Sequence, residues 1–94
     1  MSKVISLTLL TKPGCHLCDE ARTVIDQALL ALVESDSVGS KIELTEQNIL
    51  DDPELAERYA EEIPVLQING QTHAYWKIDK QRLLEALEEV SLGL

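Results

Sequence analysis

The sequence predicts an α/β fold: a mixed four-stranded sheet flanked by three helices, in the order βαβαββα. Two observations support this. Segments of alternating apolar and polar residues are separated by segments in which apolar residues recur every three or four positions. An Asn69-Gly70 pair between two apolar segments is typical of a tight β-hairpin. The chain of 94 residues is long enough for one packed core and too short for two. We therefore expect residues 1–94 to form a single domain.

The first strand and the first helix are predicted by a change in apolar periodicity. Residues 4–10 alternate and favour a strand, which Lys12-Pro13-Gly14 ends. A helix from about Cys15 to Val33 should follow, because an apolar stripe at helical spacing covers three turns: Ala21, Val24, Ile25, Ala28, Leu29 and Leu32.

A second strand is predicted over residues 41–46, with Ile42 and Leu44 facing the core. Because one helix joins this strand to the first, the two are expected to be parallel with a right-handed crossover. Asp52-Pro53 is an N-cap and first-turn pair, so a short helix should run from there to about Ala60.

The last third of the chain predicts a hairpin and a closing helix. Residues 65–68 and 72–75 favour strands on either side of the Asn69-Gly70 turn. Asp79 should cap the last helix, with Ile78 packing on Leu83 as a hydrophobic staple. Tyr75 and Trp76 are expected to serve as a core anchor and a lid on that helix.

Charge and hydropathy exclude several classes of partner and location. The formal net charge is −9, and residues 34–62 hold ten acidic and two basic side chains. Nucleic-acid backbone and anionic lipid would repel such a chain, so we expect neither nucleic acid nor membrane as a partner. The sequence also lacks an apolar run of about 20 residues and a signal segment, which favours a cytoplasmic location.

Cys15 and Cys18 are the residues most indicative of function. Cys15 lies where the first strand ends and the first helix begins, and free amide groups and the helix dipole there favour a thiolate. Thiol pKa values at such positions fall to roughly 3.5–7.5. Cys18 lies one helical turn further on nearly the same face, where it could displace a product from Cys15. The pattern favours dithiol–disulfide exchange over a structural or metal-binding role.

Neighbours of the two cysteines have two interpretations each. His16 either stabilises the thiolate as an imidazolium or is simply exposed. Asp19 either complements the helix dipole or, on the face of Cys15, opposes a low thiolate pKa or accepts the Cys18 proton. Lys12 is either solvated or binds a substrate carboxylate. Leu17 either offers an apolar contact to substrate or packs against the next loop.

A metal site is not expected. The chain has only His16 and His73 to add to the two thiols, which makes a closed four-ligand zinc site hard to build. An iron–sulfur cluster would need thiols from elsewhere.

Two segments resemble the glutaredoxin-like proteins of the thioredoxin-fold superfamily. TKPGCHLCDEA (residues 11–21) is similar to a subfamily with a Cys-His-Leu-Cys motif, and EIPVL (residues 62–66) is similar to the start of that family's third strand. The resemblance implies a thioredoxin fold in which Pro64 is a cis-proline facing the cysteines. It also implies that the backbone of Ile63 pairs with an extended substrate or with glutathione, like an added strand. The alternative is a trans proline at the first position of a strand.

The resemblance implies a thiol–disulfide oxidoreductase with Cys15 as nucleophile and Cys18 as resolving thiol. Its substrate would be a disulfide-containing protein or a glutathione mixed disulfide, and it needs a thiol reductant but no bound cofactor. Common glutaredoxins carry Cys-Pro-Tyr-Cys and, after the hairpin, a Gly-Gly pair that this chain lacks. The reductant is therefore either glutathione, a thioredoxin-like protein, a thioredoxin reductase or some other dithiol. The rival hypothesis is a non-catalytic binding or adaptor module of the same fold, and a metal or iron–sulfur protein is the weaker one.

Overall fold

The computed structural model describes residues 4–35, 41–59 and 61–93, and its elements follow the predicted order with one short addition. They are β1 (Val4–Thr11), α1 (His16–Ser35), β2 (Lys41–Asn48), the 3-10 helix η1 (Ile49–Asp51), α2 (Pro53–Tyr59), β3 (Val65–Ile68), β4 (Gln71–Tyr75) and α3 (Lys80–Gly93).

The four strands form one mixed sheet in the order β2-β1-β3-β4. β1 pairs with β2 in parallel and with β3 antiparallel, and β3 and β4 form an antiparallel hairpin. Asn69 and Gly70 join this hairpin with φ values of 51° and 83°. Positive φ at both central residues matches the twist of a tight hairpin, which is why Asn-Gly is favoured there. The sheet and hairpin predictions are thus confirmed.

Two clusters of buried side chains hold the layers together. In the main core, alternate residues of β1 and β3 pack against α1 and α3: Ile5, Leu7, Leu9, Leu66 and Ile68 meet Ala21, Ile25, Ala28, Leu32, Ile78, Leu83 and Leu87. The second cluster, here called the end cluster, joins Leu10, Cys18, Ile49, Tyr59, Ile63 and Val65, with Cys15 and Leu55 packed against it. Successive side chains of a strand point to opposite faces of the sheet. Leu10 and Val65 therefore pack in the end cluster, whereas their strand neighbours Leu9 and Leu66 pack in the main core.

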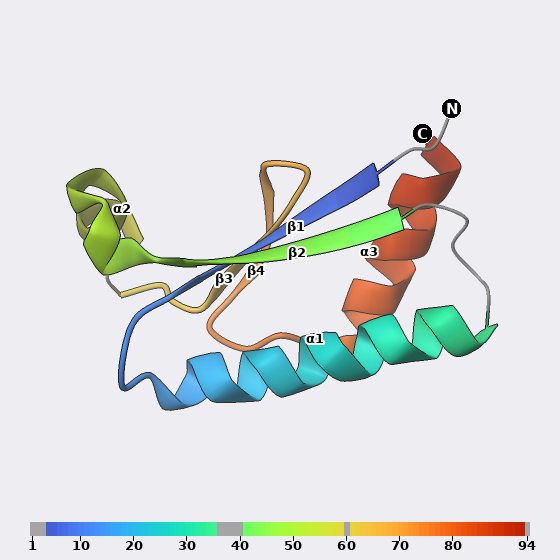
Figure 1. Ribbon diagram of the computed structural model, residues 1–94, viewed down its shortest axis with the longest axis horizontal. Helices are drawn as coiled ribbons and strands as arrows, with labels where there is room; N and C mark the ends of the chain where they lie inside the picture. Colours follow the sequence, from blue (N-terminus) through green and yellow to red (C-terminus); the bar gives the residue numbers. More distant parts are fainter. Residues whose placement is uncertain (1–3, 36–40, 60, 94) are drawn as a thin grey trace.

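Several segments that are distant in sequence meet at one end of the sheet. β1 and β2 both run toward α2, and α1 starts at this same end (left in Figure 1). The segment between α2 and β3 also lies there, and it supplies Ile63 to the end cluster. Because Cys18 belongs to the end cluster and Cys15 packs against it, this end of the molecule holds the candidate site.

The predicted helix caps are confirmed. Asp52 Oδ1 accepts a hydrogen bond from the amide of Glu54 at 2.9 Å, and Asp79 Oδ1 accepts one from the amide of Arg82 at 3.0 Å. Each carboxylate satisfies an amide of the first helical turn, which has no partner within its own helix.

Some local details differ from the predictions. The first helix is confirmed, but α1 runs from His16 to Ser35 and its end lies two residues beyond the predicted one, about Val33. η1 was not predicted; it follows Asn48, whose side chain accepts a hydrogen bond from the amide of Leu50. The predicted end of the second helix, Ala60, lies outside the described residues.

Two predictions of burial also failed. Leu44 is 40% exposed because β2 is an edge strand with a neighbour on one side only, whereas Ile42 packs partly against the main core. Tyr75 and Trp76 are 52% and 54% exposed, so neither is a core anchor.

No helix within the described ranges is long and apolar enough to cross a membrane.

Candidate active site

Cys15 occupies the N-cap position of α1. Its Sγ accepts a hydrogen bond from the amide of Cys18 at 3.1 Å, the bond that a serine or aspartate oxygen makes at an ordinary N-cap. Gly14, with a φ of 76°, lets the chain turn from β1 into the helix at this point. The sulfur therefore lies at the positive end of the helix dipole with a donor already directed at it.

The structure pairs Cys15 and Cys18 as a disulfide, with their Cα atoms 5.2 Å apart. The two residues differ in accessibility, since Cys18 is fully buried in the end cluster and Cys15 is partly exposed. A substrate can therefore approach Cys15 from solvent, whereas the fully buried Cys18 presents no surface to it.

Ile63 is the other predicted site residue that the structure brings to the cysteines. It is buried in the end cluster with Cys18, and Cys15 packs against that cluster. The Ile63–Pro64 peptide bond is cis. Within the described residues, no backbone hydrogen bond uses the amide or the carbonyl of Ile63. The neighbouring carbonyls of Glu62 and Pro64, by contrast, both accept from Trp76.

Asp19 is not a free carboxylate. It is paired with Arg22, one helical turn further on, and Arg22 also donates to Glu46 of β2. The guanidinium thus ties the first turns of α1 to the edge strand and offsets the negative charge closest in sequence to Cys15. Sequence reasoning missed Arg22, although its i, i+3 spacing from Asp19 is a recognisable helical ion-pair signal.

The remaining predicted site residues are exposed and lie on separate surfaces. His16 is exposed in the first turn of α1. Lys12 lines a polar groove of about 330 Å³ together with Arg22, Glu46 and Asp51. Leu17 is 42% exposed and belongs to a different groove. The structure therefore does not bring Lys12 and Leu17 into one pocket.

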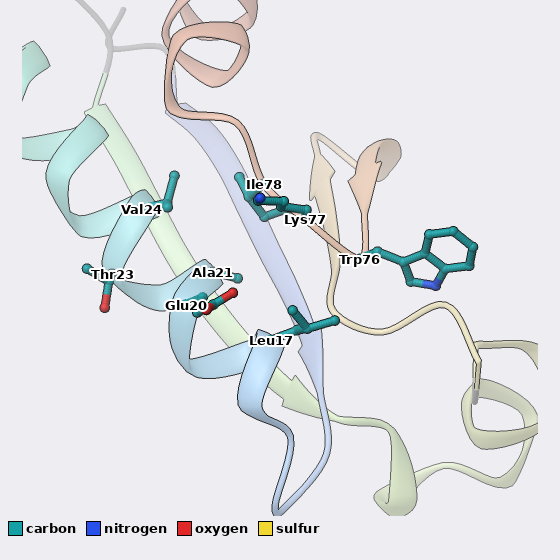
Figure 2. A pocket seen from close by; sticks show the side chains of 8 residues that line it. All are labelled: Leu17, Glu20, Ala21, Thr23, Val24, Trp76, Lys77 and Ile78. Carbon is teal, nitrogen blue, oxygen red and sulfur yellow. The ribbon is translucent and has the colours of Figure 1, made fainter.

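The second groove has a volume of about 380 Å³ and separates the first turns of α1 from the segment that connects β4 to α3. Its lining is largely apolar, and Glu20 and Lys77 are its charged members. The full lining is Leu17, Glu20, Ala21, Thr23, Val24, Trp76, Lys77 and Ile78. Figure 2 shows Leu17 pointing from the helix into this gap, while the indole of Trp76 extends away from α1.

Trp76 is a residue that sequence reasoning assigned to the wrong environment. Its φ is 66°, which is uncommon for a bulky residue. Its indole Nε1–H donates to the carbonyl of Glu61 at 2.7 Å, and its amide donates to the carbonyl of Pro64 at 2.8 Å. No sequence signal predicted these contacts, because they depend on a backbone conformation that tryptophan rarely adopts.

His73 lies in the middle of β4, at the irregularity opposite Leu66 and Gln67 of β3, and lines a small groove with Glu89 of α3. Partial burial, and then the nearby guanidinium of Arg82, lower the pKa of His73 below its ordinary value of 6.5.

Within the described residues, no three His, Cys, Asp or Glu side chains lie close enough together to hold a metal ion.

Comparison with known proteins agrees with this geometry. The family model of the glutaredoxin-like domain (DUF836) matches residues 6–88. A search of curated proteins finds no match. Two structures of target protein XcR50 from X. campestris are similar to this chain at 30% identity. The X-ray structure has a TM-score of 0.65 and covers 88% of this chain and 96% of XcR50. The solution structure has a TM-score of 0.67 and covers 88% of this chain and 92% of XcR50.

A more distant structure, described as a malarial protein, has 16% identity and a TM-score of 0.62 over 96% of this chain and 99% of its own. At that identity it supports the fold alone. The family match spans most of the chain and includes both cysteines, and the sheet and its helices have the thioredoxin-like arrangement. The chain therefore belongs to the glutaredoxin-like domain (DUF836) family.

Proposed function

We propose that this protein is a thiol–disulfide oxidoreductase in which Cys15 is the nucleophile and Cys18 the resolving thiol. The observation that supports this best is the asymmetry of the pair. Cys15 is partly exposed, and its Sγ accepts a hydrogen bond from the Cys18 amide at the start of α1, while the side chain of Cys18 is fully buried in the end cluster. An amide donor and a helix N-terminus both stabilise a thiolate, which is the attacking species in disulfide exchange.

The reaction has two exchange steps. The Cys15 thiolate attacks one sulfur of the substrate disulfide, forming a mixed disulfide and releasing the first substrate thiolate. The Cys18 thiolate then attacks Sγ of Cys15, which releases the second substrate thiolate and forms the Cys15–Cys18 disulfide. Two electrons pass from the protein to the substrate, and an external thiol reductant returns the pair to the dithiol form.

Substrate positioning is assigned to residues around the cysteines. The backbone groups of Ile63, next to Pro64, have no partner among the described residues and would form strand-like hydrogen bonds with an extended substrate. Leu17, which lies between the cysteines in the chain, offers an exposed apolar contact in its groove, and Lys12 offers a cation for a substrate carboxylate.

Two further residues are proposed to tune the thiolate of Cys15. His16 adds positive charge in the first turn of α1 when it is protonated. Asp19 adds negative charge that Arg22 partly offsets through its ion pair. The two side chains thus act in opposite directions on the same sulfur.

The partners that fit this chemistry are a disulfide-containing protein or a glutathione mixed disulfide, and a thiol reductant, either glutathione or a dithiol. No bound cofactor is required for the exchange. A cytoplasmic location suits a protein that must be kept in the dithiol form between turnovers.

Turnover of a polypeptide disulfide and of a glutathione mixed disulfide, with glutathione or a dithiol as donor, tests the proposal. The wild type should catalyse at least one reaction, and Cys15→Ser should fall to the uncatalysed rate. Equal rates for the wild type and Cys15→Ser would contradict the enzyme hypothesis and favour a binding module in which the cysteines are incidental.

A further inference from the structure

We propose that Trp76 is a positioning residue that holds the Ile63 backbone beside Cys15, and that it thereby favours disulfides within extended polypeptides over small disulfides. This inference rests on the proposed oxidoreductase function and names a determinant of its substrate class.

Trp76 holds the segment on both sides of Ile63. Its amide donates to the carbonyl of Pro64 at 2.8 Å and to the carbonyl of Glu62 at 3.3 Å. Its indole Nε1–H reaches the carbonyl of Glu61 at 2.7 Å. One residue thus contacts three carbonyls of the segment that contains Ile63 and leaves the Ile63 backbone groups unpaired among the described residues.

The conformation of Trp76 indicates that these contacts determine its position. A φ of 66° is costly for a bulky side chain and persists only where the surrounding contacts over-determine it. Burial does not supply those contacts, because Trp76 is 54% exposed. An exposed tryptophan in a strained conformation, with its indole bonded to a loop carbonyl, is better suited to fixing that loop than to filling a core.

Trp76 also connects this segment to the surface next to the cysteines. It lines the 380 Å³ groove with Leu17, the residue between Cys15 and Cys18, and with Ile78 (Figure 2). The position of Trp76 therefore sets the spacing between the Leu17 surface and the Ile63 backbone.

Only an extended substrate makes use of that spacing. A polypeptide bonded to Cys15 would lie along the Ile63 backbone and place a flanking side chain against the groove. A small disulfide needs only the accessible sulfur of Cys15. Correct placement of the 61–64 segment should thus affect KM for a polypeptide and have little effect on a small disulfide.

The test compares Trp76→Phe with Tyr75→Phe as a matched control. Phenylalanine at 76 keeps an aromatic ring but cannot donate to Glu61. Tyr75 is the neighbouring exposed ring, in edge contact with Trp76, and its substitution leaves the Trp76 hydrogen bonds in place. For each variant, kcat/KM is measured with a disulfide-linked peptide and with hydroxyethyl disulfide, and folding is checked by circular dichroism.

Trp76→Phe should lower kcat/KM for the peptide about fivefold or more through KM, and change the value for hydroxyethyl disulfide by less than about twofold. Tyr75→Phe should keep the wild-type ratio between the two substrates. A parallel fall on both substrates, or no fall on either, would overturn the inference while the proposed function stands. A wild type that reduces neither disulfide would overturn the proposed function, and the inference with it.

A second measurement does not depend on the folding of Trp76→Phe. Trp76 is the single tryptophan of the chain, so its fluorescence reports on this position alone. Titration of Cys15→Ser with the same peptide in its reduced form should shift the Trp76 emission in a saturable way. An unchanged emission up to peptide concentrations well above KM would overturn the inference.

Discussion

The amide of Cys18 donates a hydrogen bond to Sγ of Cys15 over 3.1 Å, while the side chain of Cys18 is fully buried. One residue therefore supplies both the backbone donor that stabilises a Cys15 thiolate and the second thiol of the pair. The spacing of three residues produces this because the N-cap side chain of a helix meets the amide three positions later. The same spacing places the second sulfur one turn behind the first.

The ion pair between Asp19 and Arg22 should determine how far Asp19 affects the thiolate. In Asp19→Asn the negative charge is removed and Arg22 remains, so the pKa of Cys15 should fall. In Arg22→Gln the Asp19 charge is no longer offset, so the pKa of Cys15 should rise. Because both side chains are solvent-exposed, each change should be about half a pH unit.

Thiolate absorbance of the reduced protein, followed as a function of pH, measures these pKa values. Lys80→Gln removes one exposed positive charge at the start of α3, outside the Asp19–Arg22 pair, and as a control it should leave the midpoint unchanged. Midpoints that move in the same direction in Asp19→Asn and Arg22→Gln would show that the pair does not act through its charges.

His73 should make the stability of the fold depend on pH. Because its pKa is lowered in the folded protein, the unfolded chain binds the proton more tightly. The contribution of His73 to the free energy of unfolding is therefore fully present above its ordinary pKa of 6.5. It is lost as the pH falls through that value toward the lower pKa of the folded protein.

Urea unfolding at about pH 7.5 and about pH 5.5 measures this effect. The wild type should lose more free energy of unfolding between the two conditions than His73→Gln loses. An equal loss in both proteins would assign the pH dependence to other groups.

The main core predicts a large difference between two leucine substitutions. Leu83 of α3 is fully buried, so Leu83→Ala should lower the free energy of unfolding by about 2–5 kcal/mol. Leu30 of α1 is 59% exposed, and Leu30→Ala should change stability by no more than about 0.5 kcal/mol. Denaturant unfolding of the two variants compares them directly. Similar losses at both positions would contradict the placement of the core between the sheet and these helices.

Features set by local chemistry could be predicted from the sequence. Asp52 and Asp79 cap helices because each side chain needs only an amide two or three residues further along the chain. Asn69-Gly70 forms its turn because its two residues tolerate positive φ. The position of Cys15 at a helix start also follows from local signals, since a strand-breaking segment precedes it and a helical apolar stripe follows.

Features that depend on the packing of distant segments could not be predicted in the same way. The contact between Arg22 and Glu46 requires the position of β2 relative to α1, which no single segment encodes. The burial of Ile63 with Cys18 depends on where the segment before β3 returns to the sheet. Leu44 has the alternation of a core-facing residue, but its exposure follows from the position of β2 at the edge.

Trp76 shows a different limit. Tryptophan in an apolar context is ordinarily expected to contribute to a core, and its exposure here accompanies an unusual φ. The hydrogen bonds of its amide and indole with the 61–64 segment are tertiary contacts, so they become evident only once β4 and that segment are placed side by side.

Trapping of the mixed disulfide tests the central claim, that Cys15 attacks and Cys18 resolves, most directly. Reduced Cys18→Ser and Cys15→Ser are each incubated with a disulfide-linked peptide, and the covalent products are identified by mass spectrometry. Cys18→Ser should accumulate a peptide adduct on Cys15, and Cys15→Ser should form little or none because its remaining thiol is buried. Faster adduct formation on Cys18 in Cys15→Ser than on Cys15 in Cys18→Ser would contradict the assignment.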